Sequence, residues 1–136
     1  MTLTKTQERS PRKEQLVPIT DRAFAFAVRV VKLCTYLEKH SDVGRNTINQ
    51  LLNAATSVGA NHLEEAVAGQ SKADFIHKNA IALKEARETN YRLPLISATN
   101  TFKTPVKEGI LELELELESG ELSRIIGKRI VSSKKK

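Results

Sequence analysis

The chain has 136 residues, the usual size of a single domain, and a formal net charge of +6, with 40% hydrophobic and 28% charged residues. An aromatic share of 4%, without Trp, leaves little material for stacking single-stranded bases. No apolar run approaches the roughly 20 residues of a membrane span, and the N-terminus lacks the apolar core of a signal peptide. Cys34 is the single cysteine, which fits a reducing compartment. We therefore expect a cytoplasmic, single-domain protein.

Residues 1–18 are polar and basic, and their two prolines disfavour helix, so we predict a flexible basic N-terminal segment. Thr20 and Asp21 can cap a helix over about 21–40. Its apolar residues cover more than half of the circumference: Phe24, Ala27, Val28, Val30, Val31, Leu33, Cys34 and Leu37. The remaining face is predicted to hold Arg22, Arg29, Lys32, Tyr36 and Lys39. An apolar arc this wide indicates a second contact, such as one with another subunit.

A second helix is predicted over about 46–68, because apolar residues recur at helical spacing from Ile48 to Gly59. Small residues in this stripe permit the close approach of a neighbouring helix. Gly69 is a natural position for the end of this helix.

The third helix is predicted over 71–99, opened by a capping box in which Ser71 caps and Asp74 replaces the usual Glu. One face holds Phe75, Asn79, Ala82, Ala86 and Leu93. Glu88 and Arg92 are spaced as an i, i+4 ion pair. Pro94 is expected to bend the helix or to end its regular hydrogen bonding.

The stretch 110–118 alternates between Leu and Glu after Ile110, which on period alone predicts a β-strand. Leu and Glu are strong helix formers, so we favour a helix over about 105–131, followed by a basic tail at 132–136. Such a helix has two apolar stripes. One, with Leu113 and Leu117, is predicted to face the core. The other is predicted to contact a neighbouring subunit, through Leu111, Leu115 and Leu122.

Four helices with short connections favour an all-α, antiparallel up-down-up-down four-helix bundle. The two apolar stripes of the last helix and the wide arc of the first favour assembly of this bundle into a homo-oligomer.

The segments Ser57–Asn61, Gln70–Ile76 and Ile81–Thr89 resemble the signature of the bacterial four-helix-bundle proteins also called 23S rRNA intervening-sequence proteins. The resemblance implies a ring-like homopentamer. A distant relative, the accessory variability protein of diversity-generating retroelements, is a basic pentameric barrel that binds its reverse transcriptase and associates with nucleic acid. The resemblance also singles out family-motif residues expected at subunit contacts or in ion pairs: Asn61, Glu64, Glu65, Ser71, Phe75, Glu85, Glu88 and Tyr91.

The chain departs from that family pattern in three places. His62 and Leu63 both precede Glu64, where the family usually has one residue, so a bulge or the loop near Gly69 must absorb the extra residue. Pro94 stands where the family often ends a Tyr-Trp-Leu-Arg string. The Leu–Glu alternation is also more regular than in the family.

No catalytic or metal-binding pattern stands out. The three histidines and Cys34 lack metal-ligand spacing, and Cys34 is interpreted as an inert buried thiol. We predict no enzymatic activity, no cofactor and no small-molecule substrate.

Positive charge gathers near both termini and along the third helix. We predict that nucleic-acid phosphates are bound by the basic residues of that helix: Lys72, Lys78, Lys84, Arg87 and Arg92. The alternative is that Glu85 and Glu88 neutralise these cations. Two functions therefore stay open. One is an oligomeric adaptor for RNA, DNA or a nucleoprotein enzyme such as a reverse transcriptase. The other is a structural or protein-binding ring without a nucleic-acid role.

Overall fold

The computed structural model describes residues 17–63, 66, 71–99 and 114–135. Within these ranges the chain forms four α-helices and one π-helix: α2 (Ile19–His40), α3 (Arg45–Ser57), the π-helix η1 (Val58–Leu63), α5 (Lys72–Thr99) and α7 (Leu115–Lys135). No residue of these ranges belongs to a β-strand, which confirms the predicted all-α class for this part of the chain.

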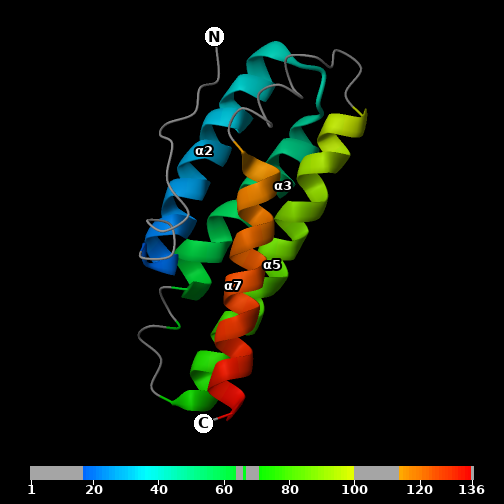
Figure 1. The fold of residues 1–136 in the computed structure, drawn as a ribbon. Helices are drawn as coiled ribbons and strands as arrows, with labels where there is room; N and C mark the ends of the chain where they lie inside the picture. Colours follow the sequence, from blue (N-terminus) through cyan, green and yellow to red (C-terminus); the bar gives the residue numbers. More distant parts are fainter. Residues whose placement is uncertain (1–16, 64–65, 67–70, 100–113, 136) are drawn as a thin grey trace.

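The helices lie side by side, and each one runs opposite to the helix before it (Figure 1). Helix α2 packs against α3 and α7, and α5 packs against the same two helices from the other side. The most extensive contact between two helices is that of α5 with α7. Because these two helices are antiparallel, the start of α5 lies beside the end of α7 (Figure 1). None of the described helices combines the length and apolar content that a membrane span requires.

The core consists of two clusters of buried apolar side chains. The larger cluster draws on α2, α3, α5 and the first turns of α7, and includes Phe26, Leu33, Leu37, Leu51, Leu93 and Leu122. The smaller one joins Ala23 of α2 to η1, α5 and Ile126 of α7. Each fully buried Leu or Phe contributes about 1.5–3 kcal/mol to stability before entropy is counted. Burial between the helices therefore decides how they are arranged.

The second predicted helix, 46–68, changes its winding partway along. Regular α-helix ends at Ser57, and the next six residues continue as the π-helix η1. A π-helix holds one more residue in a turn than an α-helix does. This π-helix is a bulge of the predicted kind at the place where the extra residue was expected, and the loop near Gly69, the other predicted place, lies outside the described residues. A Cβ atom on Gly59 would lie 3.2 Å from Cβ of Ala23, so this glycine lets η1 approach α2 closely.

Helix α5 begins as predicted. It does not end at Pro94, although an end there was one of the two effects predicted for this proline. The backbone N–H of Asp74 donates to Oγ of Ser71 at 3.0 Å, so Ser71 caps the helix. The predicted face is correct for four residues, which are buried: Asn79, Ala82, Ala86 and Leu93. The helix continues past Pro94 to Thr99, and Pro94 lies on its exposed side, where water can reach the backbone carbonyl that lacks an N–H partner.

The predicted limits of the last helix, 105–131, need correction at both ends. Glu114 has a φ of 55°, in the left-handed region, so α7 begins only at Leu115. Residues 100–113 lie outside the described part of the chain. At the other end α7 includes most of the predicted tail and ends at Lys135, where Lys side chains interact favourably with the helix dipole.

The predicted oligomer contacts on the last helix are wrong for two of three residues. Leu115 and Leu122 are fully buried in the chain's own core, so neither can contact another subunit. Leu117, predicted to face the core, is 64% exposed. Leu111 lies outside the described residues. The rotation of α7 that causes this reversal also buries Glu118, which is 5% exposed.

Candidate functional site

Glu118 of α7 forms a buried ion pair with Arg22 of α2. The guanidinium of Arg22 donates through Nε to Oε2 at 3.1 Å and through Nη2 to Oε1 at 2.7 Å, which is the bidentate geometry that favours such pairs. Nη2 of Arg29 lies 4.0 Å from Oε2 of the same carboxylate. Arg22 is 3% exposed and Glu118 is 5% exposed, so the charges are held away from water.

This ion pair corrects the predicted orientation of α2. Arg22, Arg29 and Tyr36 were expected on the outer polar face, and all three are buried. A helix turns by about 100° per residue, so turning the arginines toward α7 directs Phe24 and Val31 roughly the opposite way. The described part of the chain therefore covers the wide apolar arc only in part.

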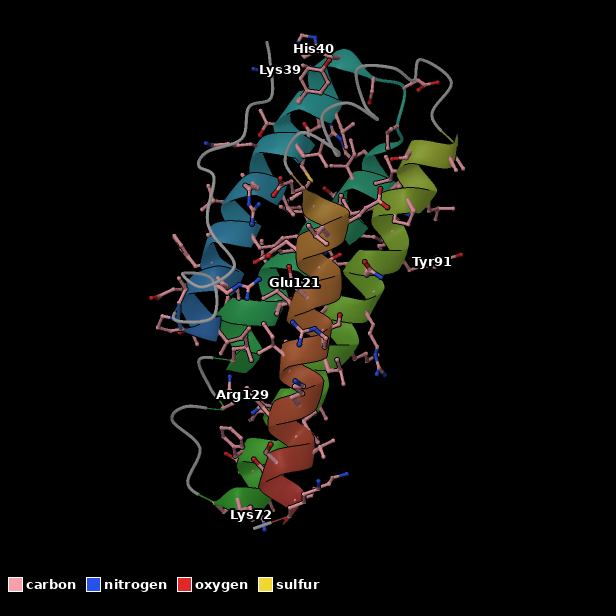
Figure 2. The ribbon with its side chains drawn as sticks, viewed as in Figure 1. Lys39, His40, Lys72, Tyr91, Glu121 and Arg129 are labelled. Carbon is pink, nitrogen blue, oxygen red and sulfur yellow. The ribbon has the colours of Figure 1, made fainter. Side chains whose placement is uncertain are left out.

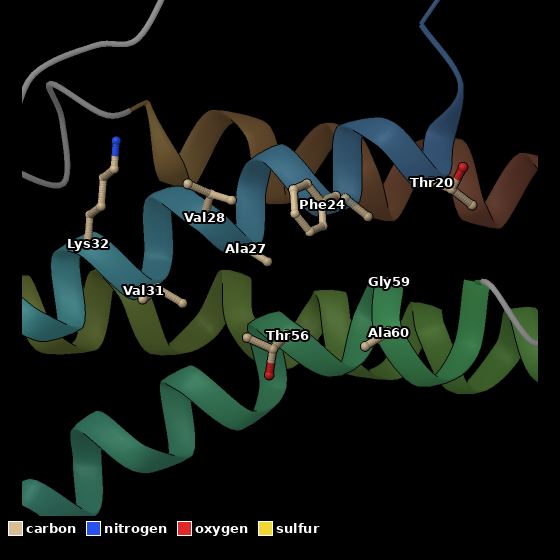
Figure 3. A pocket seen from close by; sticks show the side chains of 10 residues that line it. Thr20, Phe24, Ala27, Val28, Val31, Lys32, Thr56, Gly59 and Ala60 are labelled. Carbon is tan, nitrogen blue, oxygen red and sulfur yellow. The ribbon is translucent and has the colours of Figure 1, made fainter.

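The uncovered part of that arc forms an apolar groove between α2 and the α3–η1 segment, here called the α2 groove (Figure 3). Its volume is about 490 Å³. It is lined by Thr20, Ala23, Phe24, Ala27, Val28, Val31, Lys32, Thr56, Gly59 and Ala60. Phe24 is 71% exposed, and Val31 is exposed beside it.

The chemistry of the α2 groove is that of a binding surface. Apart from the hydroxyls of Thr20 and Thr56 and the amine of Lys32, its side chains are apolar (Figure 3). A contiguous apolar hollow on a protein surface is typical of an interaction site. Among the described residues, no group of three or more His, Cys, Asp or Glu side chains is placed to hold a metal ion.

The five cations predicted to bind nucleic acid all lie on α5, but they do not share a face. Lys72, Lys84 and Arg87 are exposed, whereas Lys78 and Arg92 are half-buried. Nε of Arg92 donates to Oε2 of Glu88 at 3.0 Å, so this predicted pair is present, and Nη1 of Arg92 donates to Gln50. Lys84 and Arg87 lie on the part of the helix circumference that is opposite its buried face.

The family-motif residues have varied positions. Ser71 is the cap of α5, and Phe75 packs under the guanidinium of Arg129. Glu88 pairs within its own helix, while Glu85 is half-buried. Tyr91 is 67% exposed and points away from the fold (Figure 2). The side chain of Asn61 and the residues Glu64 and Glu65 lie outside what the structure describes.

A basic pocket, which no sequence motif predicted, lies where the start of α5 meets the end of α7. Its volume is about 320 Å³, and it is called the Arg129 pocket here. It is lined by Phe75, Ile125, Lys128, Arg129, Ser132 and Ser133. The guanidinium carbon of Arg129 lies 5.1 Å from the ring centre of Phe75, within cation–π range. The only signal in the sequence was the excess of basic residues near the C-terminus.

Cys34 is buried against α3, with Sγ 3.9 Å from the carbonyl oxygen of Ile48. Burial, and to a lesser degree the charge of Glu38, raises the pKa of this thiol to about 12. The thiol therefore stays protonated at neutral pH, as expected of an inert core cysteine.

Comparisons with known proteins agree with this all-helical fold. A family model for the 23S rRNA-intervening sequence protein matches residues 16–127. A solved structure, that of a protein of unknown function from the S23 ribosomal protein family of Bacteroides thetaiotaomicron, is 36% identical with a TM-score of 0.72. The alignment covers 83% of this chain and 98% of that one. A search of curated proteins gave no match.

Proposed function

The chain belongs to the 23S rRNA-intervening sequence protein family, and from this premise we propose that it is a non-enzymatic subunit of a ring-like homo-oligomer. In this proposal a four-helix bundle forms each subunit, a pentamer is the expected copy number, and the ring works in the cytoplasm as an adaptor. Basic surfaces of the ring bind RNA, DNA or a nucleoprotein enzyme such as a reverse transcriptase. The observation that carries the proposal is the α2 groove.

A second copy of this chain is the occupant that we propose for the α2 groove. A cyclic ring joins two different surfaces of neighbouring subunits. The chain has such a pair, because α5 exposes an apolar ridge formed by Tyr91 and Leu95, which are 67% and 37% exposed and one helical turn apart. We place this ridge in the α2 groove of the next subunit, so that concave and convex apolar surfaces cover each other.

Two features support this arrangement. Fully burying one large apolar side chain contributes about 1.5–3 kcal/mol, and this interface would bury at least Phe24 and Tyr91. Lys84 and Arg87 lie on the same outer side of α5 as Tyr91, so they would border every interface. Rotation would repeat these cations around the ring and concentrate positive charge, which attracts nucleic-acid phosphates.

The assembly is tested by the mass in solution of wild type and Phe24→Asp, measured by light scattering over a range of concentrations. We expect wild type to be oligomeric at micromolar concentration and Phe24→Asp to need at least about tenfold more protein to associate. Leu117→Asp is the matched control, since Leu117 is similarly exposed but lies outside the groove. A monomeric wild type, or equal effects of both variants, would refute the proposed interface.

Nucleic-acid binding is tested by fluorescence anisotropy with labelled RNA and DNA of mixed sequence at 50 and 200 mM NaCl. Binding through phosphates should weaken steeply with salt, with a log–log slope of about −0.7 to −0.9 per contacted phosphate. Absence of binding at the lower salt, or binding that ignores salt, would count against the adaptor role.

The second candidate is a structural or protein-binding ring without a nucleic-acid role. The observation that favours it is the pairing of Arg92 with Glu88, together with the spread of the other α5 cations around the helix. Nuclease treatment separates the two candidates. Co-purification of one dominant protein that persists after nuclease, with no retained RNA or DNA, would support the second one.

A further inference from the structure

The Arg129 pocket differs from the α2 groove in holding a cation whose hydrogen-bonding capacity is not used. Nη1 of Arg129 is buried and has no hydrogen-bond partner among the described residues. The rest of the side chain is half-buried and lines the pocket. A guanidinium that is partly removed from water and not paired with a carboxylate is costly unless an anion can neutralise it.

Phe75 holds this guanidinium in place. Its ring lies under the Arg129 head group at 5.1 Å, on the first turn of the helix that Ser71 caps. A planar, pre-oriented guanidinium matches the geometry of a phosphate better than a flexible ammonium does. The contact with Phe75 thus restricts the position of the Arg129 guanidinium.

The surroundings are strongly basic. The stretches 71–80 and 124–135, which meet at this end of the fold (Figure 2), contain one acidic residue, Asp74. The same stretches contain seven Lys or Arg residues: Lys72, Lys78, Arg124, Lys128, Arg129, Lys134 and Lys135. Arg124 is partly neutralised by Glu121 at 3.6 Å, whereas Arg129 has no carboxylate partner in the described part of the chain.

We propose that the Arg129 pocket is a phosphate-binding subsite for a nucleic-acid backbone. Arg129 and Lys128 contact the oxygens of one phosphodiester, and the hydroxyls of Ser132 and Ser133 donate hydrogen bonds to the same group. This inference extends the proposed function and depends on the part of it that assigns nucleic-acid binding. It moves the main phosphate contact from the scattered α5 cations to the end of α7, where side chains from two helices converge.

The test measures the affinity of Arg129→Met for labelled RNA and DNA by anisotropy, from 50 to 200 mM NaCl. Loss of a charged hydrogen-bonding group should weaken binding roughly tenfold or more at the lower salt. The slope against salt should become shallower by about 0.7–0.9. Lys128→Met, at an exposed position, should weaken binding in the same way but by a smaller factor. This variant keeps the test valid if Arg129→Met does not fold. Phe75→Leu should weaken binding with an unchanged salt slope, because the charge remains.

Arg45→Met is the matched control, because Arg45 is an exposed arginine at the start of α3, at the opposite end of the fold. Helix content is checked for every variant by circular dichroism. Wild-type binding that Arg129→Met and Lys128→Met leave unchanged would overturn the subsite while the adaptor function stands. A wild type that binds neither RNA nor DNA would overturn both. The last measurement tests binding of inorganic phosphate at matched ionic strength. If Arg129 is needed for binding inorganic phosphate but not for binding RNA or DNA, the nucleic-acid assignment is overturned.

Discussion

On the side of α2 that faces α7, Arg22 and Arg29 are buried beside Glu118, whereas on the side that faces the groove, Phe24 is 71% exposed. The same helix therefore keeps charge inside and apolar surface outside. Burying the arginines is tolerable because the Glu118 carboxylate accepts two hydrogen bonds from Arg22 and lies 4.0 Å from Arg29, and Oε1 of Glu121 lies 3.8 Å from Nη2 of Arg22. Among the residues that the structure describes, nothing compensates in this way for the exposure of Phe24 and its neighbours.

The two faces of α2 therefore have different roles. The ion pair favours the observed rotation of α2 and α7 relative to each other, because a small rotation would separate the two charged groups while they are still held away from water. The apolar face is left for an external contact, which in our proposal is a second subunit. Salt should weaken neither contact strongly, since the ion pair is buried away from screening ions and apolar burial does not depend on screened charges.

The largest effect is expected when the ion pair is broken. Glu118→Ala leaves Arg22 buried without its carboxylate and should lower the free energy of unfolding by about 3–5 kcal/mol. Urea unfolding measures the loss. Glu116→Ala is the control, because Glu116 is exposed one half-turn earlier and should cost no more than about 0.5 kcal/mol. Similar losses for both variants would mean that the buried pair does not favour the observed rotation.

Thiol labelling compares the two faces directly. At pH 8, Cys34 should react more than tenfold more slowly than a cysteine introduced as Val31→Cys in a Cys34→Ala background, because burial keeps the native thiol protonated. The reaction is followed with a chromogenic disulfide in dilute protein. Concentrating the protein should slow labelling at position 31 if a second copy fills the groove. Equal rates in dilute protein would contradict the assigned faces.

The raised pKa of Cys34 also gives a dependence of stability on pH. The unfolded thiol ionises near its ordinary pKa of about 9, whereas the folded thiol keeps its proton to about 12. The contribution of Cys34 is therefore fully present below pH 9 and is lost as the pH rises toward 12. Cys34→Ala should remove this part of the alkaline decline.

The smallest effect is expected at the surface pair of α5. Glu88→Ala removes the carboxylate from Arg92, and since both side chains are partly solvated, the loss should be only about 0.2–0.5 kcal/mol. Repeating the urea titration in 1 M NaCl should make this loss disappear while the loss in Glu118→Ala remains. A loss above about 1 kcal/mol would place Arg92 in a more important contact than the structure shows.

The sequence by itself indicated four helical segments, the first three from apolar residues at helical spacing and the last from the helix propensity of Leu and Glu. It also determined the start of α5 and most of its buried face, since Ser71, Asn79 and Leu93 lie where the pattern predicted. The same segments, with the motif around Ala82–Thr89, identified the family. Local spacing contains this part of the information, but it did not give the limits of α7.

Only the tertiary structure decided which sides of α2 and α7 are buried. An apolar arc that covers more than half of a helix, or a run that alternates Leu with Glu, allows several rotations that bury similar apolar area. The choice depends on Arg22 and Glu118, which are 96 residues apart in the chain. The Arg129 pocket likewise forms because Phe75 and Arg129 meet across two antiparallel helices. Pairing at such distances is not present in any local pattern, so the groove and the pocket became visible only in the folded chain.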